Sequence, residues 1–122
     1  MLVPALEVKT LKASAVVTAT AVSCAVDLLD YEGPITFILQ STASGTGVTN
    51  AIKLVDDDAS GGSFASDVAS GGFTTVANTA SQQVLTLDSG SMKRYVKLSF
   101  TVAGGTGEGV VSCSIVGRKK YS

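Results

Sequence analysis

The chain has 122 residues, of which 45% are hydrophobic and 16% charged, with a net charge of −1 and neither histidine nor tryptophan. Without histidine, the sequence lacks Ser-His-Asp triads, Cys-His pairs and histidine-based zinc sites. A net charge near zero also argues against nucleic-acid binding, which needs a basic surface. We therefore expect a protein that is not an enzyme, has no cofactor and has no nucleic-acid partner.

The charge is unevenly distributed along the chain. Residues 1–92 carry a net charge of −6 and residues 93–122 a net charge of +5. This asymmetry has two interpretations, which are an oriented docking surface and two differently charged loop ends. The sequence leaves both open.

The N-terminal half alternates with a period of two residues. Residues 1–12 predict an extended arm or edge strand, because Leu6, Val8 and Thr10 alternate with charged residues. The uncharged run 13–26 is too short to span a bilayer, so we expect no membrane partner. It predicts two strands with an inward row and an opposite, outward row. The inward row is Val16, Thr18, Thr20, Val22, Cys24, Val26 and Leu28, and the outward row is Val17, Ala19, Ala21 and Ala25.

The rest of the chain predicts further short strands joined by turns rich in glycine and serine. Turns are expected at 30–34, 41–47, 56–63 and 104–107, and residues 65–80 are expected to be mostly irregular, with a short strand at 73–76. Alternation predicts one core built from Ile35, Phe37, Leu39, Val96, Leu98, Phe100, Val111, Cys113 and Ile115. Residues 118–122 read as a basic tail.

About eight short strands with turns at even spacing predict an all-β fold. We expect residues 1–122 to form a single-domain antiparallel β-sandwich, closed like a jelly roll because strand edges need protection. Cys24 and Cys113 both lie in apolar strand patterns and are expected to be buried free thiols. A disulfide between them stays open, because two cysteines do not fix their pairing.

An acidic turn follows the strand at residues 52–54. Asp56, Asp58, Ser60 and Asp67 have the spacing of oxygen ligands in a calcium loop. The alternative is a hairpin turn in which aspartate side chains accept backbone hydrogen bonds. We favour the hairpin turn, because the flanking segments read as strands.

Apolar residues on outward positions predict contacts with other subunits. Ile38 and Val116 both point outward by the alternation of their own strands, and the arm and tail add apolar and basic residues. The candidate interface residues are Leu2, Val3, Leu6, Val8, Ile38, Arg118, Lys119, Lys120 and Tyr121.

Two segments resemble discoidin-like jelly rolls. These are 52–58 running into Gly61-Gly62-Ser63-Phe64, and Lys93-Arg94-Tyr95-Val96-Lys97-Leu98. The exposed aromatic residues of that family are missing, so its lectin and lipid binding are not carried over.

A likeness along most of the chain is to head decoration, or cement, proteins of tailed bacteriophages. It rests on residues 25–33, the acidic turn, residues 93–96 and the terminal Val116-Gly117-Arg118-Lys119-Lys120. The resemblance implies a structural protein, made in the host cytoplasm, that binds the phage major capsid protein on the virion surface as a dimer or trimer. The alternatives are a carbohydrate-binding module for host attachment and another head or tail component.

Overall fold

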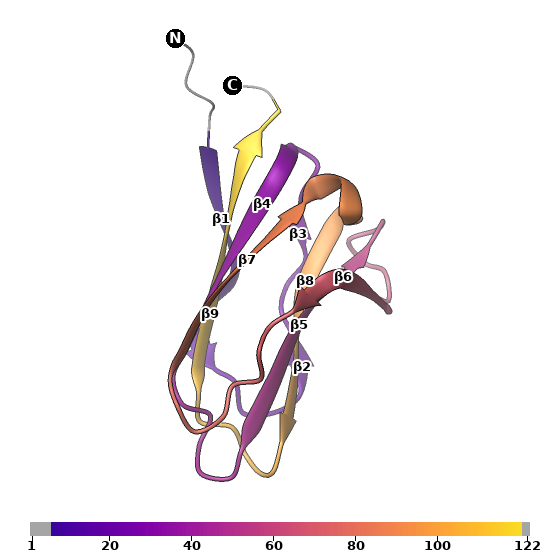
Figure 1. Ribbon diagram of the computed structural model, residues 1–122. Coiled ribbons are helices and arrows are strands. Elements are labelled where there is room, and N and C mark those ends of the chain that lie inside the picture. The colour runs from indigo at the N-terminus through magenta and orange to yellow at the C-terminus, as the bar shows by residue number, and fades with distance from the viewer. Residues whose placement is uncertain (1–5, 121–122) are drawn as a thin grey trace.

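The computed structural model describes residues 6–120, and over this range the chain forms two antiparallel sheets packed face to face (Figure 1). Sheet A contains, in order, β1 (Leu6–Val16), β9 (Val110–Lys119), β4 (Tyr31–Ser41) and β7 (Ser81–Asp88). Sheet B contains, in order, β2 (Ala21–Val22), β8 (Tyr95–Ala103), β5 (Thr49–Asp57) and β6 (Ser66–Gly72), with β3 (Val26–Asp27) also paired to β8. A short 3₁₀ helix, η1 (Ser89–Ser91), links β7 to β8.

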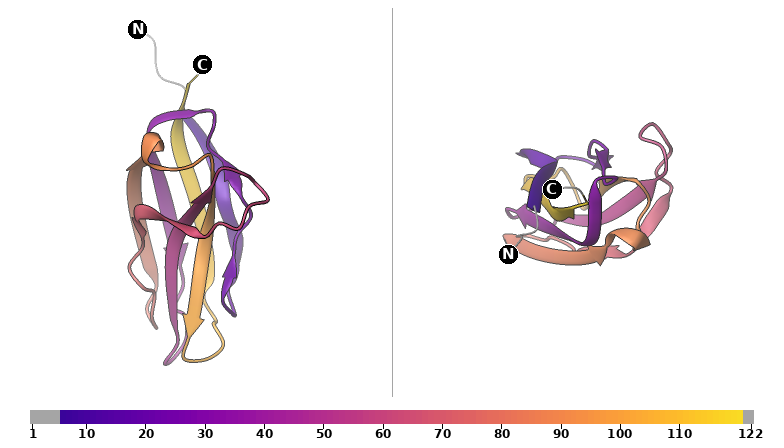
Figure 2. Two further views of the ribbon diagram at one scale, coloured as in Figure 1. Left: turned by 90° about the vertical axis from the view of Figure 1, so that its right-hand side faces the viewer. Right: turned by 90° about the horizontal axis from the view of Figure 1, so that it is seen from above.

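The strand order is that of a rolled-up hairpin. The pairs β1–β9, β2–β8, β4–β7 and β5–β6 are nested in the sequence, and β9–β4 and β8–β5 join them into the two sheets. This is the nested pairing of a jelly roll, and the predicted all-β, jelly-roll-like sandwich is confirmed. Figure 2 shows the two layers from the side and end-on.

The core lies between the two sheets and matches the predicted set. All nine residues that alternation assigned to the core are buried and belong to one apolar cluster. Strands with an unbroken period of two, such as β4, β8 and β9, bury every second side chain because one face of each sheet packs inward. In the part of the chain that the structure describes, no helix is long and apolar enough to cross a membrane.

The predicted phase of the run 13–28 is wrong from Val16 to Cys24. Val16 and Val22 are exposed, whereas Val17 is buried with the core and Ser23 is buried as well. The pairing of β1 with β9 shifts register twice between Thr10 and Ala15, and because each shift reverses the faces of the residues that follow, the two together leave Val16 outward like Val8. The predicted phase returns only at Val26 and Leu28, which pack on the core.

The region 65–80 is also more regular at its start than predicted. β6 covers 66–72 and pairs with β5, whereas the expected strand at 73–76 is reduced to one bridge between Val76 and Asn50. The side chain of Gln83 on β7 holds this segment by accepting from the Thr74 N–H at 2.7 Å and donating to the Thr74 carbonyl at 2.8 Å.

The predicted arm and tail lie largely inside sheet A. Residues 6–12 belong to the edge strand β1, where Leu11 is buried in the core, so the edge-strand interpretation holds for them. Arg118 and Lys119 are the last residues of β9 rather than a free tail. Residues 1–5 and 121–122 lie outside the described range.

Candidate functional site: two interaction surfaces

The first surface is the outward side of sheet A, called here the outer face. Even-numbered residues of β4, β7 and β9 point away from the core, and the matching side of β1 begins at Leu6. In register across the four strands, one row joins Val8, Val116, Thr36 and Thr86, and the next joins Thr10, Ser114, Ile38 and Val84. The structure thus brings together Leu6, Val8 and Ile38 from the predicted interface set.

Large apolar side chains on this face are open to solvent. Leu6 is 69% exposed, Val8 65% and Val84 63%, and Val16 and Val110 are exposed beside each other. Of these, Val16, Val84 and Val110 were missed by the sequence analysis. The alternation in β7 carried the signal for Val84, because Leu85 and Leu87 point inward and leave position 84 outward.

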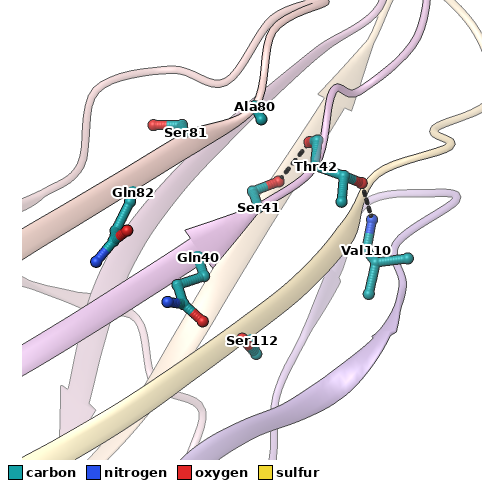
Figure 3. Close-up of a pocket in the computed structure, with 8 residues that line it drawn as sticks. All are labelled: Gln40, Ser41, Thr42, Ala80, Ser81, Gln82, Val110 and Ser112. Carbon is teal, nitrogen blue, oxygen red and sulfur yellow. Dashed lines mark hydrogen bonds between the residues drawn. The ribbon is translucent and has the colours of Figure 1, made fainter.

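One end of the outer face is polar and slightly hollow. A shallow depression of about 430 Å³ lies over the ends of β4, β7 and β9 (Figure 3). Gln40, Gln82 and Ser112 form one registered row on these three strands. The rim is held by Thr42, whose hydroxyl accepts from the Val110 N–H at 2.8 Å. This depression has amide and hydroxyl groups but no ionisable side chain, so it has no acid–base chemistry.

The second surface is the end of the sandwich where β1 begins and β9 ends, called here the terminal end. Leu6 pairs with Arg118, so the two strand ends lie side by side (Figure 1). Arg118 Nε lies 3.6 Å from Glu32 Oε1, and Lys119 Nζ lies 3.5 Å from Glu7 Oε2.

The predicted basic residues at the terminal end differ in their contacts. The side chains of Arg118 and Lys119 are in ion pairs, whereas Lys120 is exposed and donates its backbone N–H to the Asp30 carbonyl at 2.8 Å. The predicted interface residues Leu2, Val3 and Tyr121 lie outside the described residues.

Opposite charges from the two parts of the sequence meet across the fold. Three of the four ion pairs found in residues 6–120 join a base from 93–122 to an acid from 1–92. Arg94 donates from Nε and Nη2 to the two carboxylate oxygens of Asp27 at 3.0 and 2.9 Å, and this pairing lowers the pKa of Asp27. The bases of the last part of the sequence thus pair with acids on β1, β3 and β4.

The acidic turn joins the antiparallel strands β5 and β6. Asp57 accepts from the backbone N–H groups of Ala59 and Phe64 at 3.0 and 3.2 Å, and these bonds lower its pKa. Asp57, which was not among the predicted metal ligands, thus organises the turn.

The four candidate calcium ligands of the less favoured alternative do not converge. Asp56 is buried and accepts from the Lys93 N–H at 3.0 Å, and Asp67 lies 2.9 Å from Lys53 Nζ. Asp58 and Ser60 are exposed. Among residues 6–120, no group of three histidine, cysteine or acidic side chains is placed to hold a metal ion. The geometry is that of the hairpin turn.

The two cysteines are free and differ in environment. Cys113 is buried, and burial raises the pKa of its thiol to about 12. Cys24 is exposed, so the expectation that both thiols are buried is wrong for Cys24. Its exposure follows from the phase of this segment, because Ser23 takes the inward place, where its hydroxyl accepts from the Leu98 N–H at 2.9 Å and donates to the Cys24 carbonyl at 3.3 Å.

No protein-family model and no curated protein sequence matches the chain. Its fold is similar to those of several solved structures. A protein of Bacillus endospore appendages, described as disulfide-linked pili, has a TM-score of 0.55 and 16% identity over 94% of this chain and 87% of that chain. The SPBc2 prophage-derived protein YomS has a TM-score of 0.55 and 12% identity over 98% and 97%.

A third similar structure comes from a viral particle. VP2 of the infectious bursal disease virus subviral particle has a TM-score of 0.55 and 16% identity. The match covers 95% of this chain but 32% of that chain, so the chain spans about a third of VP2. At these identities the comparisons establish a shared jelly-roll sandwich fold. The role of this chain has to be argued from its own surfaces.

Proposed function

We propose that the chain is a structural protein of a phage particle, and specifically a head decoration protein that binds the outer surface of the capsid. Its partner is the major capsid protein, and its place is the virion surface. The role needs a stiff β core and docking surfaces but no catalytic groups.

The observation that carries the proposal is the terminal end. There, an apolar side chain that is 69% exposed, Leu6, stands in register with Arg118, and Lys120 follows one residue after β9. Arginine is enriched at protein–protein interfaces, and exposed basic side chains steer association with an acidic partner surface. The structural likeness to a prophage-derived protein over nearly its whole length, and to a protein of a viral particle, supports the same role.

Co-sedimentation with phage heads tests the proposal. Heads of the encoding phage, prepared without this protein, are mixed with the purified chain and pelleted. We expect the intact chain to pellet with the heads and to saturate at a fixed ratio. A variant with Arg118→Gln and Lys120→Gln is expected to bind about tenfold more weakly at low salt, with a smaller difference at high salt, because salt screens exposed charges.

A matched control removes a charge elsewhere. Lys53→Gln lies on β5 in sheet B, where its ion pair with Asp67 is exposed, and is expected to leave head binding unchanged. If the intact chain stays in the supernatant at every salt concentration, the decoration role is wrong. Binding to host cells in place of heads would favour the attachment module.

A further inference from the structure

We propose that the outer face of sheet A binds the same face of a second copy, so that the protein is a face-to-face homodimer. The outer face adjoins the terminal end and shares Leu6 with it, and the inference does not depend on the proposed role at the capsid. It begins from the position of the exposed apolar residues. Five of the seven large apolar side chains that are exposed in residues 6–120 lie on this one face, and they are Leu6, Val8, Val16, Val84 and Val110.

From Leu6 to Lys9, the phase of β1 turns Glu7 and Lys9 toward the inner side of the sheet and Leu6 and Val8 outward, before Leu11 enters the core. Glu7 pairs with Lys119, and Lys9 donates to the Asp27 carbonyl at 3.1 Å and lies 5.1 Å from the centroid of the Tyr31 ring. Pairing with β9 fixes this register. A slip of one residue would turn the apolar side chains inward, so their exposure is specified by the fold.

The central part of the outer face carries no charge. Its charged neighbours Glu32, Arg118 and Asp88 all lie at the end of the face nearest the terminal end. The outward positions between that end and the depression are Val8, Thr10, Thr36, Ile38, Gln40, Gln82, Val84, Thr86, Ser112, Ser114 and Val116. Burying this area removes no ion from water, so it avoids the desolvation penalty of charged groups.

The central part of the outer face also carries polar side chains. The hydroxyls of Thr36 and Thr86 are 3.1 Å apart and bond to each other across β4 and β7. The Gln40 and Gln82 side chains stand at the border, where their amides stay within reach of water or of a partner. The hydroxyls of Thr10 and Ser114 stand in the row of Ile38 and Val84, so a contact over this face has to supply them with partners or with trapped water.

The face has the size that a stable dimer needs. β4 and β7 pair over eight residues, from Pro34–Asp88 to Ser41–Ser81, and four strands lie side by side. At about 3.4 Å per residue and about 4.8 Å per strand, the face measures about 27 Å by about 19 Å. This footprint is about 510 Å² per copy, or about 1,000 Å² for two copies, which is the lower limit for a specific interface, and protruding side chains add to it.

A second copy is the occupant that fits this face best. Two sheets pack face to face at about −30° when their twists match, and two copies of one sheet have identical twist. A partner with an ordinary charged surface would have to desolvate its charges against an uncharged face, whereas a copy of the same face brings none. A two-fold interface pairs one patch with itself, which closes the assembly at two chains.

Analytical ultracentrifugation of the purified chain tests the inference. We expect the intact chain to sediment as a dimer at micromolar concentration. Val84→Lys places a charge in the face at a side chain that is 63% exposed in the single chain, so folding is expected to be unaffected. Because each dimer then buries two lysines, the dissociation constant is expected to rise about a hundredfold or more.

Val22→Lys is the matched control. Val22 is 55% exposed on β2 in sheet B, away from the outer face, and this variant is expected to stay a dimer. Circular dichroism and thermal melting check that both variants are folded. A chain that is monomeric at several hundred micromolar contradicts the inference, as does a folded Val84→Lys variant that associates as strongly as the control. If a monomeric chain binds heads, the decoration role stands and the dimer is contradicted. If a dimeric chain does not bind heads, the dimer stands and the decoration role is contradicted.

Discussion

The ring of Tyr31 packs against the backbone of Gly117 at the start of β4. A Cβ at position 117 would lie 2.6 Å from the Tyr31 Cδ1 atom, so only glycine fits. The sequence placed Tyr31 in a turn, but it is 1% exposed, and burial raises the pKa of its hydroxyl to about 12. Nothing in the local pattern signals this contact, because the two residues are 86 positions apart in the chain and meet only through the pairing of β4 with β9.

Gly117→Ala is expected to destabilise the protein by about 1–3 kcal/mol, because the added methyl group must displace a buried ring. Urea denaturation measures the loss as a lower midpoint. Gly72→Ala is the control, since a Cβ there would meet no atom within 4 Å and the backbone is not left-handed. Equal midpoints for the two variants would contradict the close packing of Tyr31.

Asp57 makes the stability that the acidic turn contributes to the fold depend on pH. Its carboxylate accepts two backbone hydrogen bonds, so its pKa is lower in the folded chain than in the unfolded chain. The stabilisation is therefore complete above about pH 4, the ordinary aspartate pKa, and is lost as the pH falls through the lowered folded value. We expect Asp57→Asn to melt at a lower temperature than the intact chain at pH 7, and the gap to narrow below pH 4.

The neighbouring Asp58 provides the control for this pH effect. Asp58 is exposed, and Asp58→Asn is expected to follow the melting profile of the intact chain at each pH. A gap for Asp57→Asn that stays constant between pH 7 and pH 3 would show that the two hydrogen bonds do not depend on the charge of Asp57.

At the scale of elements, the strands that the sequence predicted best are those with an unbroken period of two. In β4, β8 and β9 the alternation alone identifies the buried face. It fails over residues 13–24, where Ala13 to Val16 are all exposed and small residues on both faces leave the buried side unmarked. The outer face was predicted only in part. Alternation with Leu85 and Leu87 marks Val84 as outward, but the residues that lie beside it depend on the pairing of β7 with β4.

Because Cys24 points outward and Cys113 inward, the two thiols are expected to differ in reactivity. In the folded protein we expect iodoacetamide at pH 8 to modify Cys24, which is exposed, and to spare Cys113, whose buried thiol has a pKa of about 12. Mass spectrometry should show one adduct on the native chain and two after denaturation. Cys24→Ser should remove the native adduct. Two adducts on the native chain would contradict the burial of Cys113.

At the scale of the whole molecule, the nested pairing explains which features the sequence revealed and which it did not. Composition and turn spacing indicated an all-β sandwich, since they depend on local residues. The pairing of the first strand with the last depends on contacts across the whole chain, and so do the ion pairs Glu7–Lys119 and Glu32–Arg118. The charge asymmetry of the sequence corresponds to three ion pairs between its two parts, of which Glu7–Lys119 joins the first strand to the last.

The same topology predicts that the first residues of β1 stabilise the fold. A chain that starts at Leu11 loses the five β1 residues that pair with 114–118, the Lys9 contact with the Tyr31 ring and the Glu7–Lys119 ion pair. It also leaves the end of β9 as an unpaired strand edge, which favours aggregation. Compared with a chain that starts at Leu6, we expect a lower urea midpoint and more aggregation, measured by denaturation and light scattering. Equal midpoints for the two chains would mean that residues 6–10 behave as a free arm, as one reading of the sequence had it.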